Sequence, residues 1–135
     1  MATFNKFNAF VEALAEKVHN LGSDQLTVAL TNTLPTASNS VLADVSEISY
    51  TNLSSRNITT SSSTQTSGTY KLVVADLVLS ATGAVGPFRY VVVYNSTTAS
   101  GNLVCWFDYG SSISLANGDT LTIDFDGTNG LLQLN

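Results

Sequence analysis

The chain has 135 residues, of which only 11% are charged, and its formal net charge is −5. This length suits one domain that buries a single core without disulfide bonds or metal staples. Five basic residues are scattered along the chain, whereas nucleic acid and anionic membrane surfaces require clustered positive charge. We therefore expect one domain over residues 1–135 that binds neither nucleic acid nor membrane.

Apolar residues recur at intervals of three and four over the first 22 residues, which predicts an amphipathic N-terminal α-helix over 1–22. Thr3 is the expected N-cap, and Asn20 and Gly22 are the expected stop signals. The helix either covers one end of a β core or packs on another subunit. In the second case its apolar stripe is the candidate interface, formed by Phe4, Phe7, Phe10, Val11 and Leu14.

Residues 23–135 have the pattern of an antiparallel β domain. Alternation over 26–30 predicts a half-buried strand, which ends before Pro35 because proline lacks a backbone N–H. Residues 36–40 are expected to form a loop. The stretch 41–48 fits either a weak strand or a short helical turn.

The segment 51–69 is dominated by serine, threonine and asparagine. It is either a mobile surface loop or a loop followed by a polar edge strand over 57–66. We favour the edge strand, because a hydroxyl-rich edge avoids the apolar edge that promotes aggregation.

Two runs, 72–79 and 89–94, are apolar on both faces. Such runs predict strands covered on both sides, by the chain itself or by a neighbouring subunit. Further strands are expected over 103–109, 113–115, 121–125 and 131–134, with a tight turn at Asn117-Gly118 and turns over 95–102 and 126–130. The fold class is therefore all-β: an antiparallel β-sandwich, jelly-roll-like or immunoglobulin-like, with an N-terminal helix.

The carboxylates do not form a recognisable catalytic or metal-binding pattern. Counting a calcium loop from Asp124 through Asp126 leaves Asn129 where glycine is required and lacks the closing acid, which favours a hairpin turn. Asp108, Asp119, Asp124 and Asp126 are expected on solvated surfaces rather than as a glycosidase pair.

The remaining reactive side chains give no catalytic prediction either. His19 is the only histidine and Cys105 the only cysteine, and they are far apart in sequence. We expect Cys105 to be a buried thiol, and we expect no metal, no cofactor and no enzymatic activity. The aromatic cluster of the last third serves core packing, a protein interface or a sugar-stacking platform; its members are Tyr90, Tyr94, Trp106, Phe107 and Tyr109.

Four segments resemble a group of small structural proteins of tailed bacteriophages, widespread in aquatic phages. They are Phe4-Asn5-Lys6-Phe7-Asn8-Ala9-Phe10 with its continuation to Leu21, Leu30-Thr31-Asn32-Thr33-Leu34-Pro35, Gly86-Pro87-Phe88-Arg89-Tyr90, and Asp108-Tyr109-Gly110-Ser111-Ser112.

This resemblance implies a capsid decoration, or cement, protein. Such proteins commonly form trimers over junctions between capsid subunits, so the expected partners are two further copies of the chain and the major capsid protein. The expected location is the exterior of the virion, after synthesis in the host cytoplasm. Two alternatives stay open: a tail, connector or fibre-associated virion protein, and a carbohydrate-binding module.

Overall fold

The computed structural model describes residues 2–135, and its elements are mainly antiparallel strands. One short helix and one 3₁₀ helix, at Leu42–Asp44, accompany the strands. In chain order the elements are β1 (Asn5–Lys6), α1 (Asn8–Ala15), β2 (Leu26–Thr31), β3 (Thr60–Thr66), β4 (Thr69–Val74), β5 (Leu77–Ser80), β6 (Val85–Asn95), β7 (Leu103–Leu115), β8 (Thr120–Ile123) and β9 (Leu132–Leu134).

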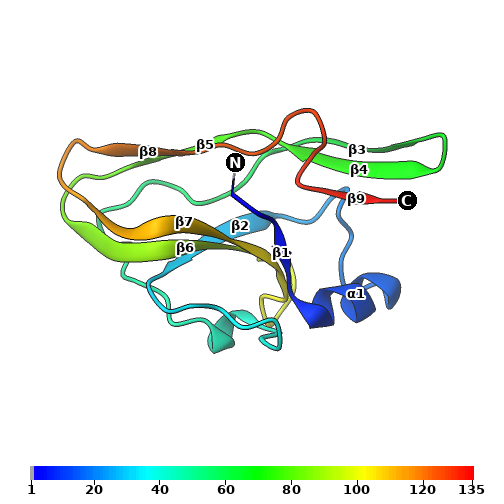
Figure 1. Ribbon diagram of the computed structural model, residues 1–135, viewed down its shortest axis with the longest axis horizontal. Coiled ribbons are helices and arrows are strands. Elements are labelled where there is room, and N and C mark those ends of the chain that lie inside the picture. Colours follow the sequence, from blue (N-terminus) through cyan, green and yellow to red (C-terminus); the bar gives the residue numbers. More distant parts are fainter. Residues whose placement is uncertain (1) are drawn as a thin grey trace.

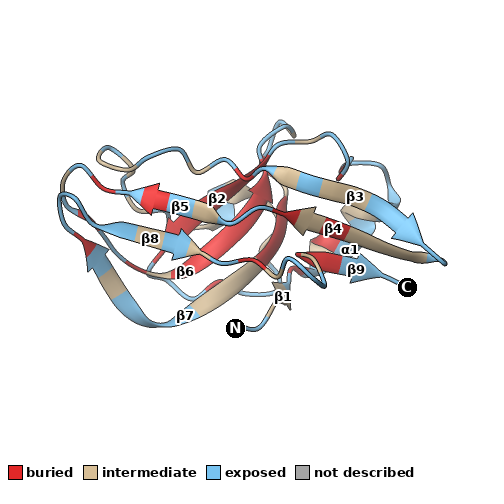
Figure 2. Ribbon diagram, turned by 90° about the horizontal axis from the view of Figure 1, so that it is seen from above, coloured by how far each residue is buried: buried red, intermediate tan, exposed pale blue. Residues whose placement is uncertain are grey.

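The strands form two layers (Figure 1). One layer is a single sheet with the strand order β1-β7-β6-β2. The other layer contains two short sheets, β3-β4-β9 and β5-β8, which run end to end above the first (Figures 1 and 2). The prediction of an all-β chain with antiparallel pairing is confirmed.

Three antiparallel pairs are nested within one another in the sequence. The inner pair is β6 with β7, the next is β5 with β8, and the outer pair is β4 with β9. The chain from β4 to β9 therefore forms one long hairpin whose tip lies in the first layer and whose arms lie in the second. This folding over brings the apolar faces of the two layers together.

The main core lies between the layers. Its fully buried members come from both layers and include Val28, Leu30, Leu72, Leu79 and Val93. Burial of this apolar surface is the dominant favourable term in folding.

A second, smaller core lies on the opposite face of the first sheet. Phe7, Ala29, Val92, Tyr94 and Leu103 form it, and Leu42, Val45 and Trp106 pack against it. All six residues of β2 are consequently buried, so the prediction that this strand is half-buried was wrong. The prediction that 89–94 is covered on both sides is confirmed, and the cover comes from the same chain.

The run 72–79 differs from its prediction as one strand covered on both faces. It is divided into β4 and β5 at residues 75–76, where the Asp76 carboxylate accepts a hydrogen bond from the Phe125 amide over 2.9 Å. The outer face of β5 is also open, since Val78 is 53% exposed.

The N-terminal helix is much shorter than the predicted span 1–22, and that prediction was wrong at both ends. Phe7, not Thr3, is the N-cap, and β1 precedes it as a short strand on β7. The helix ends at Ala15, and Lys17 adopts a positive φ of 68°. The three-and-four spacing of the phenylalanines was misleading, because Phe7 and Phe10 enter different cores.

The other local predictions have mixed outcomes. The polar edge strand is confirmed as β3, which pairs with β4 alone within the described residues, and residues 42–44 adopt the helical alternative. The predicted strands 103–109 and 113–115 are one strand, β7, with a kink at Gly110, whose φ is +102°. The turn at 126–130 is present, but it does not close a hairpin, because β8 and β9 pair with different strands.

Candidate functional site

The structure does not gather the five predicted interface residues on one surface. Phe7 and Phe10 are buried within the chain itself, whereas Phe4 and Leu14 are half-buried at opposite sides of α1. Val11 is 51% exposed and is therefore the member most available to a partner. Of the five predicted residues, Val11 and Leu14 are the two on α1 that are not buried.

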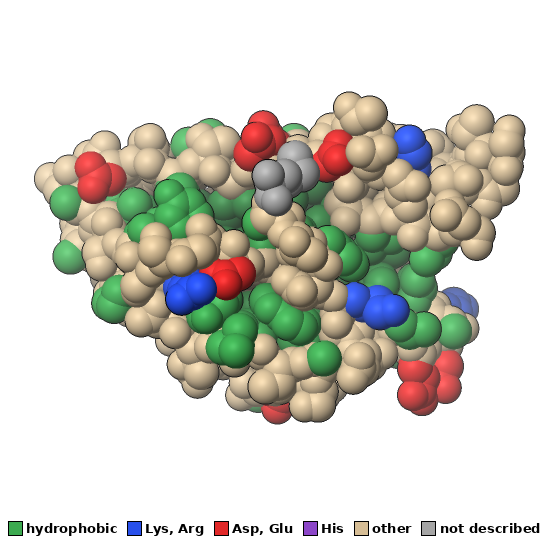
Figure 3. All heavy atoms as spheres, viewed as in Figure 1, with side chains coloured by type: hydrophobic (Ala, Val, Ile, Leu, Met, Phe, Trp, Pro, Cys, Tyr) green, Lys and Arg blue, Asp and Glu red, His purple; other side chains and the backbone are tan. Residues whose placement is uncertain are grey.

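A notch separates α1 from the end of the second layer, at the right of Figure 3. Its walls include Leu14, Val18 and, from the other layer, Tyr70 and Leu134. Val18 and Leu134 are among the exposed large hydrophobic side chains. This notch gives the chain an apolar surface that the sequence pattern alone did not reveal.

A buried polar cluster forms the inner wall of the notch. The Asn95 amide nitrogen lies 3.0 Å from His19 Nδ1 and donates to Asp24 Oδ2 over 2.6 Å. Desolvation lowers the pKa of His19, an effect larger than the opposing attraction of Asp24. His19 lies beyond the end of α1, although the sequence predicted a helix over 1–22. The cluster ties the 16–24 segment to the end of β6.

A second hollow, called here the β7–β8 groove, opens between the free edges of the two layers. It has a volume of about 250 Å³. Figure 3 shows hydrophobic side chains between the layers on this face. The lining is mostly apolar and aromatic, and includes Phe4, Phe88, Phe107, Tyr109, Ile123 and Phe125.

The strands that flank the groove have free edges. β1 pairs with β7 only at Cys105 and Trp106, and no other segment of residues 2–135 pairs with that edge of β7 beyond Trp106. β8 likewise pairs with β5 and with no second strand in the described chain. Unpaired edges of this kind can accept the backbone of another chain.

Two carboxylates, Asp124 and Asp126, stand in the lining of the groove. The Asp126 carboxylate accepts hydrogen bonds from the Thr128 and Asn129 amides, each over 2.8 Å, and these bonds hold its pKa below the usual range. Asp126 therefore caps its own loop, in agreement with the predicted turn. Within residues 2–135 no three histidine, cysteine or acidic side chains cluster as a metal site would require.

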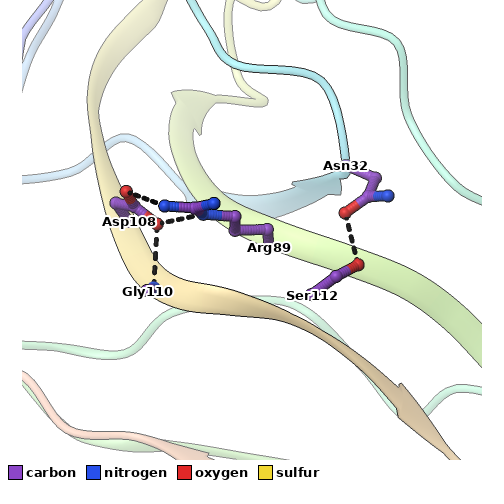
Figure 4. A network of polar contacts seen from close by, with 5 residues as sticks. All are labelled: Asn32, Arg89, Asp108, Gly110 and Ser112. Carbon is purple, nitrogen blue, oxygen red and sulfur yellow. Dashed lines mark hydrogen bonds and ion pairs between the residues drawn. The ribbon is translucent and has the colours of Figure 1, made fainter.

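Side chains from three of the four resembling segments make two sets of contacts, which join β7 to β6 and to the residue after β2 (Figure 4). Arg89 forms a two-point contact with Asp108, with Nε–Oδ1 at 2.8 Å and Nη2–Oδ2 at 3.0 Å. Asp108 Oδ1 also accepts from the Gly110 amide, and Ser112 donates to Asn32 Oδ1 over 2.7 Å. The guanidinium of Arg89 is the largest cause of the lowered pKa of Asp108. Sequence reasoning placed Asp108 on a solvated surface and did not foresee this partner.

The aromatic residues of the last third do not form a common platform. Tyr90 and Tyr94 are buried, whereas Phe107 and Tyr109 line the β7–β8 groove. Trp106 packs on the second core, with its ring centroid 4.6 Å from that of Phe7. Core packing therefore accounts for Tyr90, Tyr94 and Trp106, and a single sugar-stacking surface of all five residues is excluded.

Cys105 is fully buried, as predicted, and burial raises the pKa of its thiol. A thiol in this state is a poor nucleophile, because the thiolate is the reactive form. Among the helices of the described chain, none is long and apolar enough to span a membrane.

Comparisons of the chain with protein-family models, with curated proteins and with solved structures give no match. The β7–β8 groove, the notch and the contacts of Figure 4 are the surface features from which a function can be inferred.

Proposed function

We propose that this chain is a structural protein of a tailed bacteriophage virion, namely a capsid decoration protein. In this proposal it forms a homotrimer, binds the major capsid protein on the outside of the head and stabilises the shell. It performs no catalysis and requires no cofactor.

The observation that carries the proposal is the resemblance of four segments of the chain to small structural proteins of tailed bacteriophages. Side chains of three of these segments make contacts in the folded chain: Arg89 pairs with Asp108, and Ser112 donates to Asn32 (Figure 4). These two contacts join β7 to β6 and to the residue that follows β2. The resembling side chains therefore have a structural role in the fold.

The surface properties suit extensive contact between proteins. Charge is sparse, the β3 edge is rich in hydroxyls, and exposed apolar side chains flank the notch. Apolar surface that is rimmed by polar residues is typical of interaction sites. Many copies on a shell allow modest contacts to combine into a large total stabilisation.

The finer fold assignment belongs to the same proposal. We propose that the two layers form a β-sandwich of jelly-roll type rather than immunoglobulin type. The nested pairing of β6 with β7, β5 with β8 and β4 with β9 supports this choice, because it is the pairing of one long hairpin folded across two sheets.

The proposal is tested by the mass of the purified chain in solution and by mass spectrometry of purified virions. Light scattering should give three times the 14.2 kDa of one chain, and the chain should be present in the particle in many copies. A particle that lacks the chain would contradict virion membership. Ring-shaped oligomers of higher order, with few copies in each particle, would favour the tail or connector alternative.

A further inference from the structure

We propose that the β7–β8 groove holds an extended peptide strand of a partner protein. The strand pairs with the free edge of β7, inserts alternate apolar side chains into the groove and places a basic residue near Asp124. This inference goes beyond the proposed function, because it names how a partner is held whichever particle contains the chain.

The edge of β7 that borders the groove already accepts a strand. β1 pairs there at Cys105 and Trp106, and it is only two residues long. Beyond Trp106 the Phe4 ring packs on Phe107, with the ring centroids 6.1 Å apart, and from there to Leu115 the edge has no further strand partner in the described chain. An added strand would therefore extend an interaction that the molecule itself makes.

The same edge of β7 lacks the side chains that usually prevent pairing with another strand. Natural proteins block exposed edges with lysine, proline or uncompensated charge. From Phe107 to Leu115 the strand contains neither lysine nor proline, and its charged residue, Asp108, is neutralised by Arg89. The protection on this stretch is irregular geometry: the β6–β7 ladder shifts register between Val85 and Phe88 and between Phe88 and Tyr90, and Gly110 has a positive φ of 102°. These irregularities limit pairing to a few residues on either side.

An added strand would meet apolar and aromatic side chains on both sides of the groove. Phe107 and Tyr109 lie on β7, and Leu121 and Ile123 lie on β8, all in the lining of the groove. Tyr109 is 53% exposed, which is unusual for an aromatic residue within an apolar hollow. Strand addition takes affinity from backbone hydrogen bonds and specificity from pockets for alternate side chains. A groove of about 250 Å³ provides such pockets.

The charge at the groove favours a basic partner strand. Asp124 is exposed at the groove and has no hydrogen-bond partner within the described chain, whereas Asp126 is engaged in its own loop. The whole chain carries a formal charge of −5. A strand with a lysine or arginine beside its apolar residues is therefore the complementary partner, and an acidic strand is disfavoured.

The test uses the intact protein and a synthetic peptide of about six residues, the length of a typical strand. Valine alternates with threonine in the peptide, and a lysine ends it. Backbone amide NMR shifts should change along β7 beyond Trp106, with a Kd of about 1 mM or tighter. A peptide with a central proline should not bind, because proline cannot complete the ladder.

Three variants make the test specific. Tyr109→Ser should weaken binding about tenfold or more, as expected for an aromatic contact residue. Asp124→Asn should weaken binding at low salt, and this exposed change leaves the core untouched. Val78→Ser is the matched control, because Val78 is equally exposed on a strand but lies outside the groove, and its Kd should be unchanged.

Any of four results overturns the inference. The peptide does not bind, or the NMR shifts map to residues outside β7. The proline peptide binds as tightly as the original peptide, or Tyr109→Ser and Asp124→Asn both bind the original peptide as tightly as the unchanged protein does. The inference is also overturned if sedimentation shows that the chain self-associates without peptide and that Tyr109→Ser abolishes this, since a second copy would then be the occupant. None of these results depends on whether the chain is found in a virion.

Discussion

Replacing Phe7 by alanine separates the two roles that an N-terminal phenylalanine can have. If Phe7 belonged to an intersubunit helix face, Phe7→Ala would weaken assembly and leave the folded chain stable. In the structure Phe7 is fully buried in the second core and packs on Trp106 at 4.6 Å between ring centroids. The expected loss therefore falls on the stability of the single chain.

The magnitude follows from the cavity that the substitution leaves. Phenylalanine-to-alanine changes in a core typically cost about 3–5 kcal/mol, through lost transfer free energy and the residual cavity. A domain of this size has a total stability of about 5–15 kcal/mol. Phe7→Ala should thus remove about a fifth or more of the free energy of unfolding. Phe7→Asp should be more damaging, because it buries a charge without a partner.

The assay is urea denaturation followed by the fluorescence of Trp106, the single tryptophan, which reports on the ring that contacts Phe7. Val11→Ala is the control, because this side chain is 51% exposed on the same helix and should change the free energy of unfolding by less than about 0.5 kcal/mol. A loss below about 1 kcal/mol for Phe7→Ala, or equal losses for both variants, would refute the placement of Phe7 in the second core.

Three further predictions follow from the buried polar and thiol groups. Asn95→Ala should lower the free energy of unfolding in urea by about 1.5–3 kcal/mol, because it leaves His19 and Asp24 without their shared donor. Since burial lowers the pKa of His19, protonation favours the unfolded chain, so stability should fall as the pH decreases from about 7 to 5, and His19→Gln should flatten this dependence. A pH dependence that is identical in the variant would contradict the burial of His19. Cys105 should resist a thiol reagent at about pH 8 in the native protein and react fully in urea, and fast native labelling would contradict its burial.

Much of the strand pattern could be predicted because alternation and turn residues are local signals. The tight turn at Asn117-Gly118 is an example: the Asp119 amide bonds to Ala116 over 3.0 Å, and Gly118 supplies the required positive φ of 89°. The burial of Cys105 and the polar edge strand β3 were also predictable from residue type.

The errors arose where distant contacts override a local pattern. The spacing of Phe7 and Phe10 fits one helical stripe, but two separate cores compete for these rings, and the second core depends on residues 42–45 lying over the far face of β6. Asp76 interrupts the apolar run 72–79, and its carboxylate accepts a hydrogen bond from the amide of Phe125, which is distant in sequence.

The candidate site was the least predictable part of the molecule. The β7–β8 groove is lined by residues of both layers at their free edges, and no local pattern in the sequence encodes how these strands come together. The pairing of Arg89 with Asp108 depends in the same way on the register between β6 and β7. Each residue was visible in the sequence, but its partner was not.

We propose that this chain decorates a phage capsid, and the decisive experiment is cryo-electron microscopy of the virion. A decoration protein should give density that fits the two-layered β fold, in trimers on the outer surface of the head at junctions between capsid subunits. Density for the chain in the tail alone, or its absence from the particle, would contradict the claim.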